Sequence, residues 1–564
     1  MKSVRIPVLV CCGALAVFGA PSARAWDYVR EGTGGLAVLI HSSGDVVSAG
    51  SQGDPAAGLH EGVVVRHDAQ TGLEKWRYSV SQGGYGTRSV VLLHAPGDDL
   101  FVVSTQGGRY GGDSSDVLRL EAATGAMQWS VHLEATALVA AGVDPEGELV
   151  AAGATSGPDG VNGDQNFLTI KFSGSTGAEL WRSAIDGSLH DDDRAQAVAV
   201  NEQGDLFVGG FLTDDPALNF PDFTLFKLSG SDGSELWRSG VPSLEGHGGE
   251  IRSLALDGAG DVVAAGTASL GGWCDFVVAK FSHGDGDEIW RRVENFSCDF
   301  ASAVAVDSRD DVLVTGALSS FSTLKLSGQT GTPLWRHDLA VPPGCTGHAG
   351  ECAVGQGIRV LPNGNAVVAG TGPAPEGSVK EIVVAELDAI SGAEIWSHRS
   401  HHPGSCNDGG WGGMGLDASA DGGVAVAGNY WTQVDGVCSW PPVMRYVAKK
   451  LAPDSDADDV DDDDDNCLLQ ANPLQLDFDS DGFGDACDAD YDNSGRVTIG
   501  DFHHFRSVFE LNRGDPGFDP AADHDNSGSV TLSDLQSLRR SFGIAPGPSA
   551  LECAGSVPCV RPGL

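Results

Sequence analysis

The sequence predicts an all-β propeller followed by a small C-terminal region with short helices. Two recurring features carry this prediction, a tight turn followed by tryptophan and an apolar strand that ends in glycine. The tryptophans recur at intervals of 45 to 61 positions and are Trp76, Trp129, Trp181, Trp237, Trp290, Trp335 and Trp396. A period near fifty with short strands is typical of propeller blades that each contain four strands.

One copy of the unit spans residues 167–210. An apolar strand leads to a Thr-Gly turn and Trp181, and an alternating strand then leads through Gly204-Asp205 to the strand LFVGG. Each Trp follows a tight turn, where it can fill the gap between neighbouring blades. The Gly-ended strands carry small and β-branched residues, so we expect them to be the inner strands near the axis. They span 46–50, 98–104 (a divergent copy), 149–153, 206–210, 262–266, 312–316, 366–370 and 424–428.

The blade count follows from a mismatch between these two features. There are eight such strands but seven turn-plus-Trp motifs, and the last segment ends at Leu451 before its Trp-bearing strand. Trp26 lies fifty residues before Trp76. We therefore expect the strand at Trp26 to complete the last blade and close the ring, which removes exposed sheet edges. This interpretation gives eight blades, with seven as the alternative.

The first 25 residues have the pattern of a bacterial-type secretory signal peptide. A basic start precedes a short apolar run, and Ala23-Arg24-Ala25 supplies a small-x-small cleavage site before Trp26. The Cys11-Cys12 pair lacks the small residue that a lipoprotein signal requires, so no lipid anchor is expected. No later segment has eighteen consecutive apolar residues, and a membrane span is not expected. These features predict a secreted or cell-surface protein.

Ten cysteines follow the signal peptide, and an even number in an exported chain favours disulfides. They form sequential couples at 274/298, 345/352, 406/438, 467/487 and 553/559, although sequence alone leaves the connectivity open. A zinc site is the weaker interpretation, because no Cys-x-x-Cys pair follows residue 25.

The formal net charge of −44 excludes a generic nucleic-acid-binding protein, which needs a basic surface. Much of the acidity lies between Asp454 and Asp492, where sixteen aspartates occur without Lys, Arg or Glu. Short carboxylates concentrated in this way suit the coordination of a hard cation.

The propeller repeats, which cover residues 26–452, resemble two groups of known repeats. The Thr-Gly-x-x-x-Trp turn resembles the pyrroloquinoline-quinone (PQQ) type, and 192–210 resembles a bacterial repeat of the form D-x-A-x-A-V-A-V-D-x-x-G-D-x-x-V-x-G. The resemblance implies the architecture and says little about activity.

Quinone dehydrogenases of that type hold their cofactor with calcium, a catalytic Asp and often a disulfide between adjacent cysteines. Here the only adjacent cysteines lie in the signal peptide, and no residue matches the catalytic Asp. A glycosidase or lyase would need paired carboxylates. Loop acids at 191–193 and 214–215 are expected to be solvated, so no catalytic or cofactor-binding residue is assigned.

Residues 453–489 resemble the thrombospondin type 3 repeat, with its Asn-Cys, Asn-x-x-Gln and Gly-x-Gly-Asp-x-Cys spacing. Asp459 and Leu468 depart from the Gly and Pro usual there. The alternative is an acidic disordered linker. The resemblance implies calcium ligands at Asp454, Asp456, Asp458, Asp462, Asp465, Asp477, Asp479, Asp481, Asp485 and Asp488.

Residues 490–543 contain two EF-hand-type loops, each followed by a helical pattern. Oxygen ligands at alternating positions and glycine at position six fit a backbone that curls around calcium. The ligands expected are Asp490, Asp492, Ser494, the Arg496 carbonyl and Asp501, then Asp523, Asp525, Ser527, the Ser529 carbonyl and Asp534. The pair resembles a dockerin module, which implies a cohesin-like partner, although the 33-residue spacing and Ser at position five depart from that pattern. A Pro/Gly-rich tail follows at 544–564.

These features predict a secreted, non-catalytic calcium-binding interaction or adhesion protein. In this interpretation the propeller is a binding platform for an extracellular protein or polysaccharide, and the C-terminal region is a calcium-ordered stalk or docking module. The alternatives are an extracellular carbohydrate-active enzyme that carries a dockerin-like tag, and a quinone-dependent dehydrogenase.

Overall fold

The computed structural model describes most of the chain from Trp26 onward. The described ranges are 26–31, 34–54, 59–69, 71–84, 87–107, 113–156, 165–214, 221–243, 248–270, 274–295, 299–318, 320–339, 353–373, 380–400, 405–408, 414–419, 422–432, 443–451, 465–472, 474–549, 551 and 553–559. The predicted signal peptide and the expected ligands Asp454, Asp456, Asp458 and Asp462 lie outside them.

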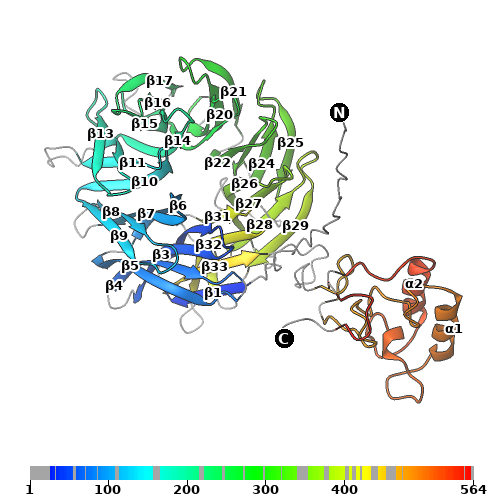
Figure 1. The fold of residues 1–564 in the computed structure, drawn as a ribbon. Helices are drawn as coiled ribbons and strands as arrows, with labels where there is room; N and C mark the ends of the chain where they lie inside the picture. The colour runs from blue at the N-terminus through cyan, green and yellow to red at the C-terminus, as the bar shows by residue number, and fades with distance from the viewer. Residues whose placement is uncertain are drawn as a thin grey trace, which may run out of the picture.

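The strands form a ring of antiparallel sheets around a central axis (Figure 1). Seven sheets contain four strands that are adjacent in chain order. The first four are β2 (Gly34–Ile40), β3 (Val46–Asp54), β4 (Leu59–His67), β5 (Glu74–Gly84); β6 (Thr87–Ala95), β7 (Asp99–Gly107), β8 (Asp113–Leu120), β9 (Met127–Leu133); β10 (Thr136–Val143), β11 (Leu149–Ser156), β12 (Gln165–Phe172), β13 (Glu179–Ile185); and β14 (Arg194–Val200), β15 (Leu206–Leu212), β16 (Asp222–Leu228), β17 (Glu235–Val241). The next three are β18 (Glu250–Leu256), β19 (Val262–Ala268), β20 (Asp275–Phe281), β21 (Glu288–Glu294); β22 (Phe300–Val306), β23 (Val312–Ala317), β24 (Phe321–Leu326), β25 (Pro333–Asp338); and β26 (Val354–Val360), β27 (Ala366–Pro373), β28 (Lys380–Leu387), β29 (Glu394–Ser400).

The remaining sheet joins the two ends of the repeat array. It contains β30 (Ser405–Asp408), β31 (Gly415–Ala418), β32 (Val424–Thr432), β33 (Val443–Leu451) and, from the start of the chain, β1 (Trp26–Glu31). β1 pairs antiparallel with β33, and Trp26 lies opposite Lys450. The same Lys–Trp register occurs inside the regular blades, for example Lys171 opposite Trp181. The predicted propeller is confirmed, with seven regular blades and an eighth, composite sheet that closes the ring through the N-terminal strand.

The strands expected nearest the axis are in fact second in each blade. The first strands, such as β14, β18 and β22, contact one another in succession around the axis. The second strands are buried on both faces, as β19 is throughout, because sheets pack against both sides of them. The glycine that ends these strands is required for a different reason. An added Cβ on Gly153, for example, would lie 1.9 Å from the carbonyl oxygen of Ala137 in the bulged strand β10.

The repeated tryptophans join each blade to the next, as predicted. Trp181 Nε1 donates to the carbonyl oxygen of Gly230 in the following blade at 3.1 Å, and Lys171 Nζ donates to the same oxygen at 2.9 Å. The Trp ring lies against Gly233, whose φ is 73° and whose added Cβ would be 2.5 Å from the ring. Six junctions repeat this arrangement; their acceptors are Ala122, Gly174, Gly230, His283, Gly328 and Ala389.

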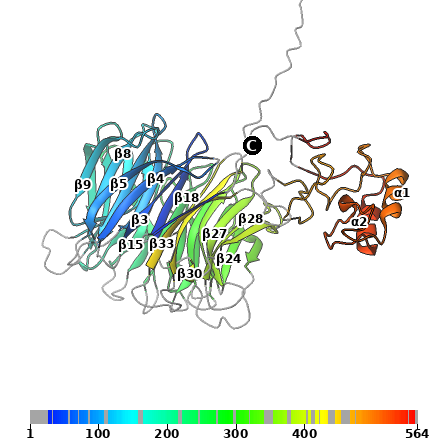
Figure 2. The same cartoon turned by 90° about the horizontal axis from the view of Figure 1, so that it is seen from below.

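The two faces of the ring differ. Tight turns, such as 144–148 and 173–178, connect the first to the second strand and the third to the fourth. The second and fourth strands of each blade end on the opposite face, where the longer connections begin (Figure 2). β33 ends and β1 begins on the tight-turn face, so the chain continues to the C-terminal region from that side. Of the cysteine couples 274/298, 345/352 and 406/438, Cys274 is disulfide-bonded and Cys406 lies in β30, while the other four cysteines lie outside the described ranges.

The C-terminal region contains two short helices, α1 (Ile499–Val508) and α2 (Leu532–Ser541), and the 3-10 turn η1 (Pro520–Ala522). Each helix begins with a capping box, Thr498 with Asp501 and Thr531 with Asp534. A small core lies between them; its buried members are Ala489, Val497, Phe505, Val508, Ala522, Val530 and Leu538. The predicted disulfides Cys467–Cys487 and Cys553–Cys559 are present. Among the described residues, no helix is both long enough and apolar enough to cross a membrane.

Candidate metal centres in the C-terminal region

Three loops of the C-terminal region each bring three carboxylates together. Within each group, one oxygen from every member lies within 4.8 Å of the others. The groups are Asp477, Asp479 and Asp481; Asp490, Asp492 and Asp501; and Asp523, Asp525 and Asp534. In the part of the chain that the structure describes, groups of this kind occur nowhere else.

The loops 477–488, 490–501 and 523–534 share one backbone conformation. The fourth residue of each loop has a positive φ, between 50° and 62°, and the sixth is a glycine with φ between 84° and 91°. This conformation turns the backbone N–H groups of residues five and six toward the first carboxylate. Gly482 N donates to Asp477 Oδ2 at 2.9 Å, and Gly528 N donates to Asp523 Oδ2 at 2.8 Å. The sequence therefore builds the same concave scaffold three times, once in the thrombospondin-like arm and twice in the EF-hand-type pair.

The last carboxylate of each EF-hand-type loop connects the loop to its helix. Asp501 Oδ2 accepts from Thr498 N at 2.7 Å, and its other oxygen accepts from Asp492 N at 3.3 Å. Asp534 makes the same two contacts, with Thr531 N and Asp525 N. Position twelve therefore caps the helix and faces the loop interior at the same time.

The remaining donors expected in these two loops also converge. Ser494 Oγ lies 3.1 Å from Asp490 Oδ1 and 3.2 Å from the Arg496 carbonyl oxygen. In the second loop Ser527 Oγ lies 3.2 Å from the Ser529 carbonyl oxygen. Carboxylate, hydroxyl and carbonyl oxygens in one concave loop are a donor set for a hard cation such as calcium. The residues present therefore fit the ion that the sequence predicts.

Other expected ligands of the arm lie outside these groups. Asp465 Oδ1 accepts from Cys467 N at 2.8 Å, Asp485 Oδ1 from Phe478 N at 3.0 Å and Asp488 Oδ1 from Asp490 N at 2.7 Å. These contacts brace the backbone of the arm.

Burial makes the carboxylates of the arm difficult to ionise. It raises the pKa of Asp481 to about 6, that of Asp485 to about 7 and that of Asp488 to about 8, and neighbouring aspartates add to the effect in each case. Burial and neighbouring aspartates both oppose the ionised form of these three carboxylates. A bound cation would stabilise that form.

A hydrogen-bonded pair that sequence reasoning missed connects the three loops. Tyr491 and His524 are the second residues of their loops, and the Tyr491 hydroxyl lies 2.9 Å from His524 Nε2. His524 Nδ1 donates to the Asp485 carbonyl oxygen at 2.6 Å, which leaves Nε2 as the acceptor. Burial lowers the pKa of His524 and keeps it neutral. In the sequence, Tyr491 and His524 occupy the same position of their two loops, and this match could have indicated the pair.

In the propeller, one acid expected to be solvated is instead buried. Asp193 is fully buried, and its carboxylate accepts from Gly187 N at 2.5 Å and from Thr213 N at 2.7 Å. Burial raises its pKa to about 6. Asp191 and Asp192 are exposed, as expected. Asp193 therefore holds the 186–193 connection onto its blade.

Comparisons with known proteins agree with this architecture. Residues 113–274 match a family model, PQQ_2, described as outer membrane protein assembly factor BamB. This part of the propeller therefore resembles PQQ-type repeats. The match covers two of the regular blades in whole and two in part. No curated protein sequence matches the chain.

Solved propellers resemble the chain at low identity. BamB from Moraxella catarrhalis is 14% identical, with 75% of this chain and 100% of that chain covered and a TM-score of 0.41. Sqt1 from Chaetomium thermophilum, solved with the N-terminus of a ribosomal protein, is 13% identical, with 70% and 94% covered and a TM-score of 0.46. Quinohemoprotein alcohol dehydrogenase from Comamonas testosteroni is 12% identical, with 75% and 76% covered and a TM-score of 0.44.

Proposed function

We propose that the protein is a secreted or cell-surface, non-catalytic interaction protein whose C-terminal region is ordered by calcium. The observation that supports this most strongly is the threefold repetition of one loop scaffold around converging carboxylates. The signal-peptide pattern at residues 1–25 supports export to a compartment where calcium is abundant.

Apart from two disulfides, the C-terminal region has little else to hold it together. Its main apolar core has seven buried residues, and it contains many aspartates whose mutual repulsion opposes folding. Calcium would be held by the three carboxylate groups, the Ser494 and Ser527 hydroxyls and the carbonyl oxygens of Arg496 and Ser529. When bound, the ion would supply the positive charge that the loops lack. Folding and ion binding would then be linked.

The propeller supplies the binding platform in this proposal. The second and fourth strands of its blades end on the face opposite the one from which the chain continues, so a ligand on that face would leave the C-terminal region accessible. The ligand class is an extracellular protein or polysaccharide, and a cohesin-like module is the candidate partner of the dockerin-like pair.

Limited proteolysis of the full mature chain tests this proposal. In calcium we expect the region 465–559 to resist cleavage, and in a chelator we expect cuts throughout it while the propeller stays intact. Magnesium at the same concentration is the control for ionic strength and should protect less, because Mg²⁺ tolerates these irregular loops poorly. An identical cleavage pattern in calcium and in chelator would contradict the proposal.

A further inference from the structure

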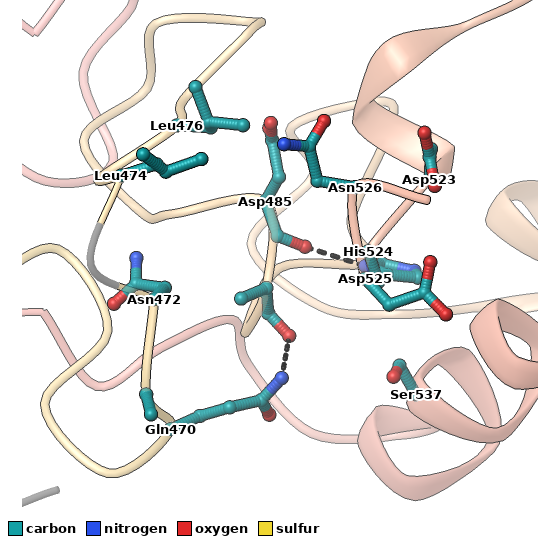
Figure 3. Close-up of a pocket in the computed structure, with 12 residues that line it drawn as sticks. Gln470, Asn472, Leu474, Leu476, Asp485, Asp523, His524, Asp525, Asn526 and Ser537 are labelled. Atoms are coloured by element: carbon teal, nitrogen blue, oxygen red, sulfur yellow. Dashed lines mark hydrogen bonds between the residues drawn. The ribbon is translucent and has the colours of Figure 1, made fainter. Parts of the chain in front are cut away.

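A cavity of about 440 Å³ lies between the thrombospondin-like arm and the second EF-hand-type loop (Figure 3). One wall comes from the arm and the other from the loop and helix α2, and His524 at the base links the two walls through the Asp485 carbonyl. This volume is within the range of pockets that hold small ligands or a few side chains.

Four of the seven arm residues that line this cavity are apolar. Leu474, Leu476, Ala471 and Ala486 line it, and Leu474 is 67% exposed. A large aliphatic side chain left in water beside a cavity is a site where a partner gains by burying apolar surface.

The charge of the cavity is of one sign. Its lining contains three aspartates and neither Lys nor Arg, and its histidine is buried and hydrogen-bonded on both ring nitrogens. A divalent ion in the 523–534 loop would neutralise two of the three carboxylates grouped there and leave one negative charge. Asp485, whose pKa burial raises to about 7, adds a partial negative charge at neutral pH. The cavity therefore stays negative whether or not the loop is occupied.

We propose that this cavity is a docking site for a basic side chain, Lys or Arg, presented on an extended partner peptide with apolar neighbours. The aliphatic stem and the neighbouring residues would cover Leu474 and Leu476, while the cationic head would lie near Asp485 and Asp525. Long basic side chains bury their stems and keep their charge at a polar surface in this manner. The inference deepens the proposed function and rests on it, because it names the chemistry of a partner for the C-terminal region.

A fluorescein-labelled peptide, acetyl-Ala-Leu-Arg-Leu-Ala, serves as the probe, and the same peptide with Glu in place of Arg is its control. Fluorescence anisotropy with the full mature chain in calcium should show saturable binding of the Arg peptide and at least about tenfold weaker binding of the Glu peptide. Equal binding of both peptides, or binding of neither, would overturn the proposal.

Two matched leucines locate the binding on the molecule. Leu474→Asp should weaken binding of the Arg peptide by about tenfold. Leu469→Asp should leave it unchanged, because Leu469 is similarly exposed, at 71%, but does not line the cavity. Ser537→Arg places a tethered cation at the cavity wall and should also block the peptide. An equal loss with Leu469→Asp, or no loss with both Leu474→Asp and Ser537→Arg, would overturn the assignment.

The same samples separate this inference from the calcium proposal. Calcium-dependent protection from proteolysis should persist in Leu474→Asp and Ser537→Arg, which also shows that both variants fold. If calcium protects the region and the peptides do not discriminate, only the docking site fails. If the peptides discriminate and calcium protects nothing, only the calcium proposal fails.

Discussion

Trp396 Nε1 donates to Glu386 Oε2 at 2.7 Å, within its own blade. At the six preceding junctions the Trp donates instead to a backbone carbonyl of the next blade, and a Lys or Arg occupies the place of Glu386. The next sheet is the composite one, where β33 and β1 are different ends of the chain and no turn joins them. Glu386 therefore supplies the acceptor that the missing turn cannot, and Asn365 Nδ2 donates to its other oxygen at 2.6 Å.

Replacing Glu386 should destabilise the propeller, and more so when the new side chain offers no hydrogen-bond acceptor to Trp396. Glu386→Leu leaves the buried Trp396 N–H without a partner and should cost about 1–3 kcal/mol in the free energy of unfolding. Glu386→Gln keeps an acceptor and should cost less. Chaotrope unfolding of the full chain, followed by Trp fluorescence, measures both. Equal stability of Glu386→Leu and the parent would show that this contact does not hold the junction.

The buried pair between Lys325 and Asp307 should be far more sensitive than pairs on the blade surface. Its two side chains are about 1% exposed and 2.6 Å apart. Lys325→Met leaves the longer Arg309 contact, at 3.5 Å, as the only described ion pair of the buried Asp307 carboxylate, with an expected loss of about 3–5 kcal/mol. Arg182→Ala removes an exposed pair with Glu179 and should cost no more than about 1 kcal/mol. The same unfolding assay compares them, and similar losses would contradict the prediction.

Glycine is required where a Trp of the preceding blade lies on the turn. Gly331 has φ of 67°, and an added Cβ would lie 2.5 Å from the Trp290 ring. Gly331→Ala should therefore lower the unfolding temperature through both backbone strain and displacement of the ring, with a loss of more than about 1 kcal/mol. Gly284→Ala is the control, because its nearest contact would be Ser282 Oγ at 3.7 Å. A tolerated Gly331→Ala would contradict this packing.

The metal-free C-terminal region should become less stable as the pH rises from about 5 to 8. The pKa values of Asp481, Asp485 and Asp488 are raised in the fold to about 6, 7 and 8. Unfolded aspartate titrates near 3.9, so between these values the folded state binds more protons and loses stability as they leave. Calcium should oppose this trend, because it binds the deprotonated form. Circular dichroism melts at several pH values test it, and stability that rises with pH in the metal-free protein would contradict it.

Tyr491→Phe should weaken the coupling between calcium binding at the two EF-hand-type loops, although it removes no calcium ligand from either loop. The hydroxyl contact to His524 is lost, while the carboxylate groups remain. We expect calcium binding to become less cooperative with little change in the number of ions bound. Calorimetric titration measures both quantities. An unchanged binding curve would show that the Tyr491–His524 contact carries no coupling.

Local pattern was sufficient to predict the repeat architecture. The spacing of the Trp motifs predicted the blades, and the missing eighth motif predicted the pairing of the strand at Trp26 with the last blade. The loop residues of 490–501 and 523–534 also come together as the spacing predicted. In each case the relevant residues are fixed by short-range periodicity or by turn chemistry.

Features that depend on packing between distant segments were not predictable in this way. The burial of Asp193 depends on the Thr213 backbone, and the strand nearest the axis is decided by contacts between blades. The role of Glu386 depends on the absence of a turn in the neighbouring sheet. Asp485 and Asp488 carry the spacing of ligands, yet they hydrogen-bond to the backbone outside the carboxylate groups.

The most direct test of the calcium proposal is a calorimetric titration of the full mature chain with calcium. Asp477→Asn, Asp490→Asn and Asp523→Asn each remove the first carboxylate of one loop, and each should lower the number of bound ions by one. Glu202→Gln, an exposed residue on a propeller turn, should lower it by none. Binding that is absent in the parent chain, or a stoichiometry that none of the three variants changes, would contradict the account.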